Sequence, residues 1–319
     1  MSGAPSAAGD LASIVDGARK EGALNLVWSP KIAGTPEDFA DWAAAFNKQY
    51  GLNLKVQYTP GGTFPQMAAQ LVQEVQSNRS ATSDVYLGSP TNVLSLVKAK
   101  AVQQVNWAAW APNVKNPALY SSDGSAVEIE LAFPGISYNT NLLKGDQVPK
   151  SLQDLLKPEF KGKVASTPYA AHFNELATPP LWGEQKTTTY LQALAKQVSG
   201  LIACGELPRV ASGEFAVFAL DCDAAIYYPE YMSVPVNSLH PNAAKLWINF
   251  VLSREGQDLM YKENFGDHPL VPGSKTAAQM QQITSQGVKF IDTNLDFFQT
   301  QPDNSKLRDQ YQAILQGKA

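Results

Sequence analysis

The sequence is poor in the residue types that most often carry catalysis or bind metals. Its 319 residues include two cysteines and three histidines. The histidines, His172, His240 and His268, are scattered without the spacing of a metal site. The nucleophile-elbow, Walker A and dinucleotide-binding motifs are also absent. We therefore expect neither a catalytic set nor a bound cofactor.

Long apolar runs and an excess of positive charge are missing too. No run of about 18 apolar residues occurs, so the sequence predicts no membrane-spanning helix. The formal net charge is -4, which argues against a nucleic-acid-binding surface. The segment Met1–Gly9 has neither the charged nor the apolar region of a signal peptide. We expect a native leader to be absent from this sequence.

The two cysteines leave two interpretations open with equal weight. Cys204 and Cys222 are either buried thiols or the two ends of one disulfide that closes a short loop. Sequence spacing does not show whether their Cα atoms approach as closely as a disulfide requires.

The first third of the chain alternates short apolar strands with amphipathic helices. Strands are expected at 23–28, 52–58 and 83–87, with helices at about 36–50, 67–75 and 90–100. This order predicts an α/β fold with a mainly parallel sheet. A chain of 319 residues exceeds the size of most single cores, so we expect two domains.

The domain boundaries are predicted from two crossings of the chain. An extended apolar stretch at 128–138 is expected to enter a second lobe, and the chain is expected to return after Tyr228-Pro229. The first lobe would then comprise residues 1–134 and 229–319, and the second lobe residues 135–228. Two lobes joined in this way predict a cleft that closes on a ligand by hinge motion.

Several short motifs, each weak alone, follow one another in a characteristic order. They are Phe46–Gly51, Ser83–Ser89, Gly135–Asn141, Ser151–Val164, Arg209–Glu214, His240–Leu246 and Ser253–Gln257. In this order they resemble the extracellular solute-binding proteins of bacterial ABC transporters, in the group of ferric-iron, thiamine and aminoethylphosphonate binders. The resemblance extends from Glu21 to about Gly273.

This resemblance implies a two-lobed type II periplasmic binding protein fold with the ligand at the hinge. It also implies a periplasmic or surface-tethered receptor that delivers a small-molecule solute to a membrane permease. We expect a monomer that is not an enzyme and that binds no nucleic acid.

In the first lobe, candidate ligand-binding residues lie just past the predicted strands. They are Trp28, Ser29, Thr63 and Ser89, at the carboxyl ends of strands, where α/β sheets bind ligands. Helix N-termini at the same positions favour an anionic group such as a carboxylate. The alternative is that the hydroxyl groups only cap helices.

In the second lobe and at the crossings, the candidates are Tyr138, Tyr169, His172, Asn174, Asp221 and Tyr228. Tyr169 together with Phe173 predicts an aromatic wall, and Asp221 would pair with an ammonium group of the solute. Structural roles, such as a core histidine or a turn aspartate, are weighed equally for His172 and Asp221.

The leading hypothesis is a receptor for a small organic solute that carries a carboxylate or an aromatic group. The first alternative is a ferric-iron receptor, because the resemblance implies adjacent tyrosines as iron ligands and Tyr227-Tyr228 are adjacent. This pair is displaced from the implied position, which falls nearer Cys222-Asp223. The second alternative is an enzyme on the same scaffold.

Overall fold

The computed structural model forms two compact units. It describes residues 10–29, 35–132, 135–170, 173–179, 181–203, 206–219, 226–262, 266–285, 287, 290–300 and 305–318. Unit 1 consists of residues 1–132, 228–287 and 293–299, and unit 2 of residues 133–227, 288–292 and 300–319. The chain thus enters unit 2 after residue 132 and returns at residue 228. The C-terminal residues 300–319, which the sequence analysis assigned to the first lobe, belong to unit 2.

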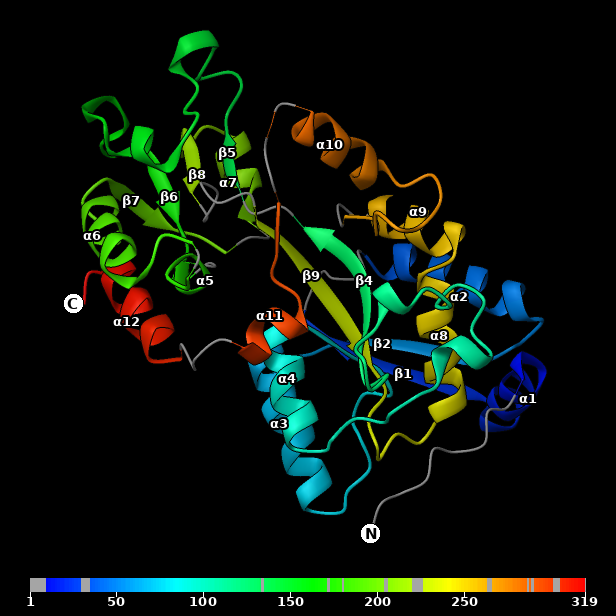
Figure 1. Cartoon of the computed structure of the whole chain (residues 1–319). Helices are drawn as coiled ribbons and strands as arrows, with labels where there is room; N and C mark the ends of the chain where they lie inside the picture. Colours follow the sequence, from blue (N-terminus) through cyan, green and yellow to red (C-terminus); the bar gives the residue numbers. More distant parts are fainter. Residues whose placement is uncertain are drawn as a thin grey trace. The chain divides into compact units, whose positions relative to one another are not determined.

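Unit 1 alternates strands and helices, as drawn in Figure 1. Its elements are α1 (Leu11–Glu21), β1 (Ala23–Trp28), α2 (Pro36–Tyr50), β2 (Lys55–Pro60), α3 (Phe64–Gln76), β3 (Tyr86–Gly88), α4 (Pro90–Lys98), β4 (Val127–Ala132), most of β9 (Ile226–Ser233), α8 (Pro241–Val251), α9 (Arg254–Lys262), α10 (Lys275–Thr284) and α11 (Leu295–Thr300).

Unit 2 is built from shorter elements. They are β5 (Ile136–Tyr138), the 3-10 helix η4 (Leu152–Leu156), β6 (Val164–Ser166), α5 (Phe173–Leu176), α6 (Glu184–Leu194), β7 (Val198–Leu201), α7 (Pro208–Ala211), β8 (Val217–Ala219), β10 (Ile291–Asp292) and α12 (Ser305–Leu315).

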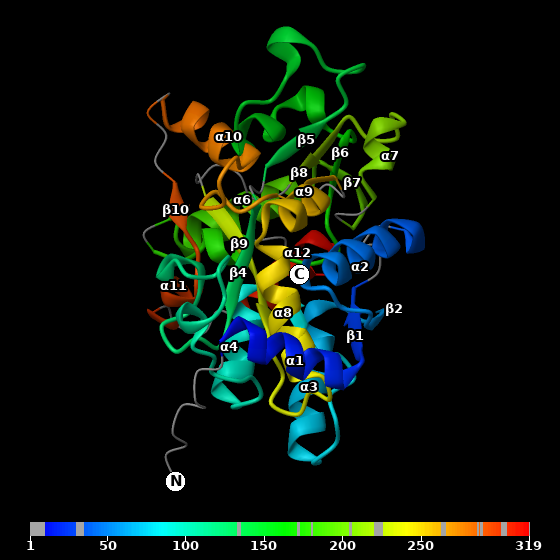
Figure 2. The same cartoon turned by 90° about the vertical axis from the view of Figure 1, so that its right-hand side faces the viewer.

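The strands of unit 1 pair in both directions. β1 and β2 are parallel, whereas β3 and β4 both run antiparallel to β9. β4 and β9 lie side by side in both views (Figures 1 and 2). β1 is joined to the segment before β3 by a bond from the Asp84 amide to the Asn25 carbonyl, at 2.8 Å. The sheet is therefore mixed, although its first strands are parallel as predicted.

Helices cover both faces of the unit 1 strands. α1, α2 and α8 share one buried core, while α3, α4 and α11 share another with Tyr228 and Tyr231 of β9. In α2 the helical spacing of Phe39, Trp42 and Phe46 points these side chains at Trp247 of α8, with ring centroids 6.2, 6.1 and 5.1 Å away. Trp247 is fully buried and forms the centre of this aromatic core.

Unit 2 has its own sheet and core. The strand order is β5-β8-β6-β7, in which β5 is antiparallel to β8 and the other neighbours are parallel. The core includes Tyr311, Ile314 and Leu315 of α12 packed with Leu191 and Leu194 of α6. This packing explains why the C-terminal helix belongs to unit 2. No helix in the described parts of either unit has the length and apolar character needed to cross a bilayer.

We predict that Trp247→Ala lowers the free energy of unfolding of unit 1 by about 3–5 kcal/mol, because truncation of a buried aromatic leaves a cavity. Urea unfolding followed by circular dichroism measures the loss. Leu239→Ala is the control, because Leu239 is 60% exposed and surface truncations change stability by about 0.5 kcal/mol or less. Equal losses in the two variants would show that the aromatic core is not a main source of stability.

Candidate functional site

Trp28 lies at the carboxyl end of β1 but belongs to the core. Burial alternates along β1, and Leu24, Leu26 and Trp28 all point inward. The Trp28 indole is 1% exposed and its Nε1 donates to the Val85 carbonyl at 2.8 Å. The prediction that Trp28 faces a ligand is therefore corrected, because the period of the strand places its ring in the protein interior.

Ser29 and Thr63 are brought together at the carboxyl edge of β1 and β2. The Ser29 hydroxyl donates to the Gly62 carbonyl at 2.7 Å, and the Ser29 carbonyl accepts from the Tyr58 hydroxyl at 2.9 Å. Thr63 is the N-cap of α3 and forms a capping box with Gln66. Both hydroxyl groups thus have partners, but of the two only Thr63 caps a helix, as the alternative interpretation expected.

Ser89 lies at the same edge, directly after β3, and is the N-cap residue of α4. Its side chain is 8% exposed, and its hydroxyl donates to the Asn92 side-chain carbonyl at 2.7 Å. The N-termini of α3 and α4 therefore both open at the carboxyl edge of the unit 1 strands. Their backbone amides and dipoles give this edge an affinity for anionic groups.

Tyr228 does not converge with its neighbour Tyr227. Both lie in the extended strand β9, where successive side chains point to opposite faces. Tyr228 is 9% exposed and packs in the core of α3 and α4, whereas Tyr227 contacts Phe290 with ring centroids 6.2 Å apart. The two rings thus have different neighbours among the described residues.

Tyr138 and Tyr169 lie at opposite ends of the unit 2 sheet. β5 is antiparallel to β8, so Tyr138 pairs with Val217 at the start of β8, which in turn pairs with Val164 at the start of β6. Tyr169 instead follows Ser166, the last residue of β6. The two phenol rings are equally exposed, at 38%, but only Tyr169 lies at the carboxyl edge of the parallel strands.

The remaining candidates of unit 2 are buried or not described. Asn174 is 5% exposed and its side chain bonds the Glu175 carboxyl group. Burial raises the pKa of Glu175 to about 7. The predictions for His172 and Asp221, and the question of a disulfide between Cys204 and Cys222, concern residues outside the described ranges.

A pair of buried acids, Glu130 and Glu230, was missed by the sequence analysis. Glu130 of β4 is opposite Glu230 of β9, and their side chains share a hydrogen bond. Glu130 is 3% exposed, and one oxygen of each carboxyl group has no hydrogen-bond partner among the described residues. Burial raises the pKa of both groups, that of Glu230 to about 7, and the charge of Glu230 raises that of Glu130 further. The pair therefore holds a proton near neutral pH.

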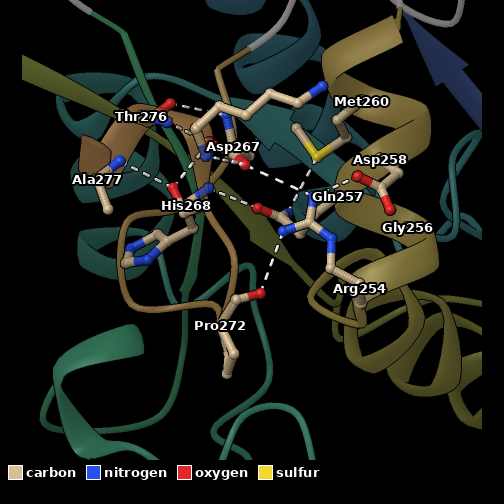
Figure 3. Close-up of polar contacts among 12 residues, drawn as sticks. Arg254, Gly256, Gln257, Asp258, Met260, Asp267, His268, Pro272, Thr276 and Ala277 are labelled. Atoms are coloured by element: carbon tan, nitrogen blue, oxygen red, sulfur yellow. Dashed lines mark hydrogen bonds and ion pairs between the residues drawn. The ribbon is translucent and has the colours of Figure 1, made fainter. Parts of the chain in front are cut away.

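A polar network around α9 and the start of α10 holds the segment that follows Gly266 (Figure 3). Gln257 of α9 donates to the Ile129 carbonyl at 3.0 Å, and its own oxygen accepts from the His268 amide. The His268 ring lies 3.1 Å from the Glu128 carboxylate, and Asp267 caps α10 by accepting from the Thr276 amide at 2.7 Å.

Gly266, the residue before this network, donates its backbone N–H to Glu130, which lowers the pKa of that carboxyl group. A Cβ atom at position 266 would collide with the Leu131 carbonyl. The close approach of the two backbones therefore requires glycine at this position.

The sequence did carry a signal for the pair. Glu128 and Glu130 interrupt the apolar stretch Val127–Leu131, and Glu230 follows Tyr228-Pro229. Charged residues in a strand that is expected to be buried are rare unless paired. Which acid faces which depends on the strand register, and that register was not available from the sequence.

The acidic groups do not by themselves form a complete metal site. Within the described ranges, no group of three or more His, Cys, Asp and Glu side chains could hold a metal ion. Tyrosine phenols and backbone carbonyls are further oxygen donors that could complete such a site. Any cation bound at the carboxyl edge of unit 1 would therefore need oxygen atoms in addition to those of Glu130 and Glu230.

We predict that Glu230→Gln reduces the loss of stability that the wild-type protein shows as the pH rises. The pKa of Glu230 is raised from 4.5 to about 7 on folding, so its contribution to stability is fully present below about pH 4.5 and is lost as the pH approaches about 7. The shift is worth on the order of 3 kcal/mol. Tyr86, Glu128 and His268, the neighbouring titratable groups, are unchanged in the variant.

Urea unfolding at about pH 4.5 and about pH 7.5 measures the effect. Glu159→Gln, the same change at an exposed position, serves as the control. If Glu230→Gln and Glu159→Gln lose stability with pH to the same extent as the wild type, the proposed protonation of the pair is wrong.

Comparison with known proteins agrees with this fold. A family model described as bacterial extracellular solute-binding protein matches residues 41–200, half of the chain. The Fe(3+)-binding periplasmic protein of Serratia marcescens is 26% identical over 281 residues, which cover 79% of this chain and 81% of that protein.

Two solved structures show the same architecture at low sequence identity. The substrate-binding protein of an ABC transporter from Agrobacterium tumefaciens has a TM-score of 0.74, with 15% identity over 95% of this chain and 97% of that one. A Trichodesmium protein (IdiA, FutA) in complex with iron and citrate ligands has a TM-score of 0.63, with 15% identity over 93% and 99%.

Both units therefore adopt the α/β periplasmic binding protein fold, with two mixed sheets flanked by helices. The chain belongs to the bacterial extracellular solute-binding protein family, whose members are non-enzymatic receptors that bind a solute as part of an ABC transporter.

Proposed function

We propose that the solute bound by this receptor is ferric iron. The observation that carries the proposal is the similarity to the Fe(3+)-binding periplasmic protein of Serratia marcescens, which extends over 79% of the chain. This proposal favours the iron alternative over the leading hypothesis of the sequence analysis, an organic solute.

The chemistry of Tyr169 supports an iron ligand. Fe(III) is a hard cation that favours anionic oxygen ligands, and a phenolate is one of these. The Tyr169 ring is 38% exposed and follows β6 at the carboxyl edge of the unit 2 strands, where α/β folds bind ligands. Tyr227 and Tyr228 are weaker candidates as a pair because their side chains point to opposite faces of β9.

The remaining parts of the function follow from the family. We propose that the protein works as a monomer in the periplasm, or tethered to the cell surface, and delivers its iron to the membrane permease of the importer. The negative formal charge of -4 is compatible with a cationic cargo, because it adds no long-range repulsion toward Fe(III).

An organic carboxylate remains the second candidate solute. It is supported by the N-termini of α3 and α4, which lie at the same edge of unit 1 and have Thr63 and Ser89 as their N-cap residues. Helix N-termini bind carboxylates through their free backbone amides.

We predict that Fe(III), offered as its citrate complex, produces a visible tyrosinate-to-iron charge-transfer band. Tyr169→Phe should weaken iron binding by about tenfold or more, equivalent to at least about 1.4 kcal/mol, and should reduce this band. Absorption titration measures both quantities. Tyr138→Phe is the matched control, because Tyr138 has the same 38% exposure but lies at the other end of the sheet.

Two results would overturn parts of this proposal. If Fe(III) causes neither a band nor a rise in melting temperature, while an organic carboxylate raises that temperature, the second candidate is correct. If both tyrosine variants bind iron as tightly as the wild type, Tyr169 is not a ligand.

A further inference from the structure

The acids Glu130 and Glu230 occupy the edge of unit 1 where a ligand is expected, and no ion pair of the described residues neutralises them. We propose that they form a cation-binding subsite that supplies carboxylate oxygens to the bound metal ion. The inference rests on the proposed function for the identity of that ion, ferric iron. Its structural basis is independent of the comparisons.

The strand register places the pair at the carboxyl edge of the unit 1 strands. Gly88, the last residue of β3, pairs with Tyr231 of β9. Because β3 and β9 are antiparallel, Glu230 lies one position past the end of β3, beside Ser89. Glu130 is opposite Glu230 on the other side of β9. Both acids therefore lie at the edge where α/β sheets bind their ligands.

Within the described ranges, no cationic side chain pairs with either acid. Among the ion pairs of the described residues, none involves Glu130 or Glu230. One oxygen of each carboxyl group is buried without a hydrogen-bond partner in the same part of the chain. Buried carboxylates are normally paired with a cation, hydrogen-bonded or used to coordinate a metal. The two carboxyl groups share one hydrogen bond, and the second oxygen of each is left for the last of these roles.

The backbone around the pair is held in a fixed geometry. The register of β4 against β9 shifts between Glu128 and Glu130, and bulges of this kind redirect a side chain next to a functional site. The Gly266 amide binds Glu130, and the network in Figure 3 holds the segment that follows Gly266. Fixed ligands of this kind bind a metal ion with little loss of side-chain entropy.

The two acids differ in their exposure to solvent. Glu130 is 3% exposed, whereas Glu230 keeps part of its surface in contact with solvent. Two carboxylates do not complete the coordination of a hard trivalent ion. The open positions would be filled by water or by carboxylate oxygens of a chelator such as citrate.

The test uses the double variant Glu130→Gln/Glu230→Gln, the single variant Glu230→Gln and two trivalent ions. Fe(III) as its citrate complex is followed by absorption, and Tb(III), a hard oxygen-seeking ion, is followed by luminescence excited through nearby tyrosines. The glutamine amides keep a hydrogen bond across the strands and carry no charge. The double variant should therefore melt at or above the wild-type temperature, yet bind both ions at least about tenfold more weakly.

Glu74→Gln is the matched control. Glu74 is also a buried acid of unit 1, but its oxygens accept hydrogen bonds from the Thr82 hydroxyl, the Thr82 amide and Gln70. Its substitution should lower the melting temperature and leave the affinity for both ions unchanged. A purely structural role of Glu130 and Glu230 would give this same pattern in their variants.

The outcomes separate the inference from the proposed function. Wild-type affinity for both ions in a folded Glu130→Gln/Glu230→Gln protein would overturn the subsite, while iron binding itself would stand. If the wild type binds Tb(III) through the pair but not Fe(III), the subsite is supported and the proposed function is wrong. If the double variant does not fold, an unchanged affinity in folded Glu230→Gln contradicts the subsite, and a weakened affinity supports it.

Discussion

The antiparallel pairing of β4 with β9 is the interaction on which the rest of this structure depends. These strands contain or border two of the five points where the chain passes between its units, after residue 132 and before residue 228. Their register also decides that Glu130 is opposite Glu230 and that Tyr231 bonds Glu128 at 3.0 Å. The backbone hydrogen bonds between β4 and β9 thus join two segments of unit 1 that are distant in sequence. They also place two acidic side chains at the carboxyl edge of its strands.

Local signals made most of the first unit predictable. Thr35 caps α2 with Asp38 in a capping box, and Gly51 ends the helix with a positive φ of 60°. The spacing of Phe39, Trp42 and Phe46 identified the buried face of α2. These features depend on neighbours within one or two helical turns, so a sequence reveals them without knowledge of the fold.

Features that depend on distant partners could not be predicted in the same way. The direction of β5 is set by its pairing with β8, and it carries Tyr138 away from the edge where Tyr169 lies. The position of α12 follows from packing against α6. For the site, the end of β1 at Trp28 was located correctly, whereas β2 and β3 end one or two residues later than expected. The pairing of Glu130 with Glu230 required the register of two strands far apart in sequence.

The absence of a Cβ atom at Gly266 lowers the pKa of the Glu130 carboxyl group, because it lets the Gly266 backbone approach that group closely. With no side chain, residue 266 presses its backbone against Leu131 and points an N–H at Glu130. Any larger residue would move this peptide away from β4, and Glu130 would then lose the Gly266 N–H, which stabilises its ionised form. The affinity of Glu130 and Glu230 for a cation would therefore depend on the distance between the backbones of residues 131 and 266. The number of charged residues in the sequence does not reveal this distance.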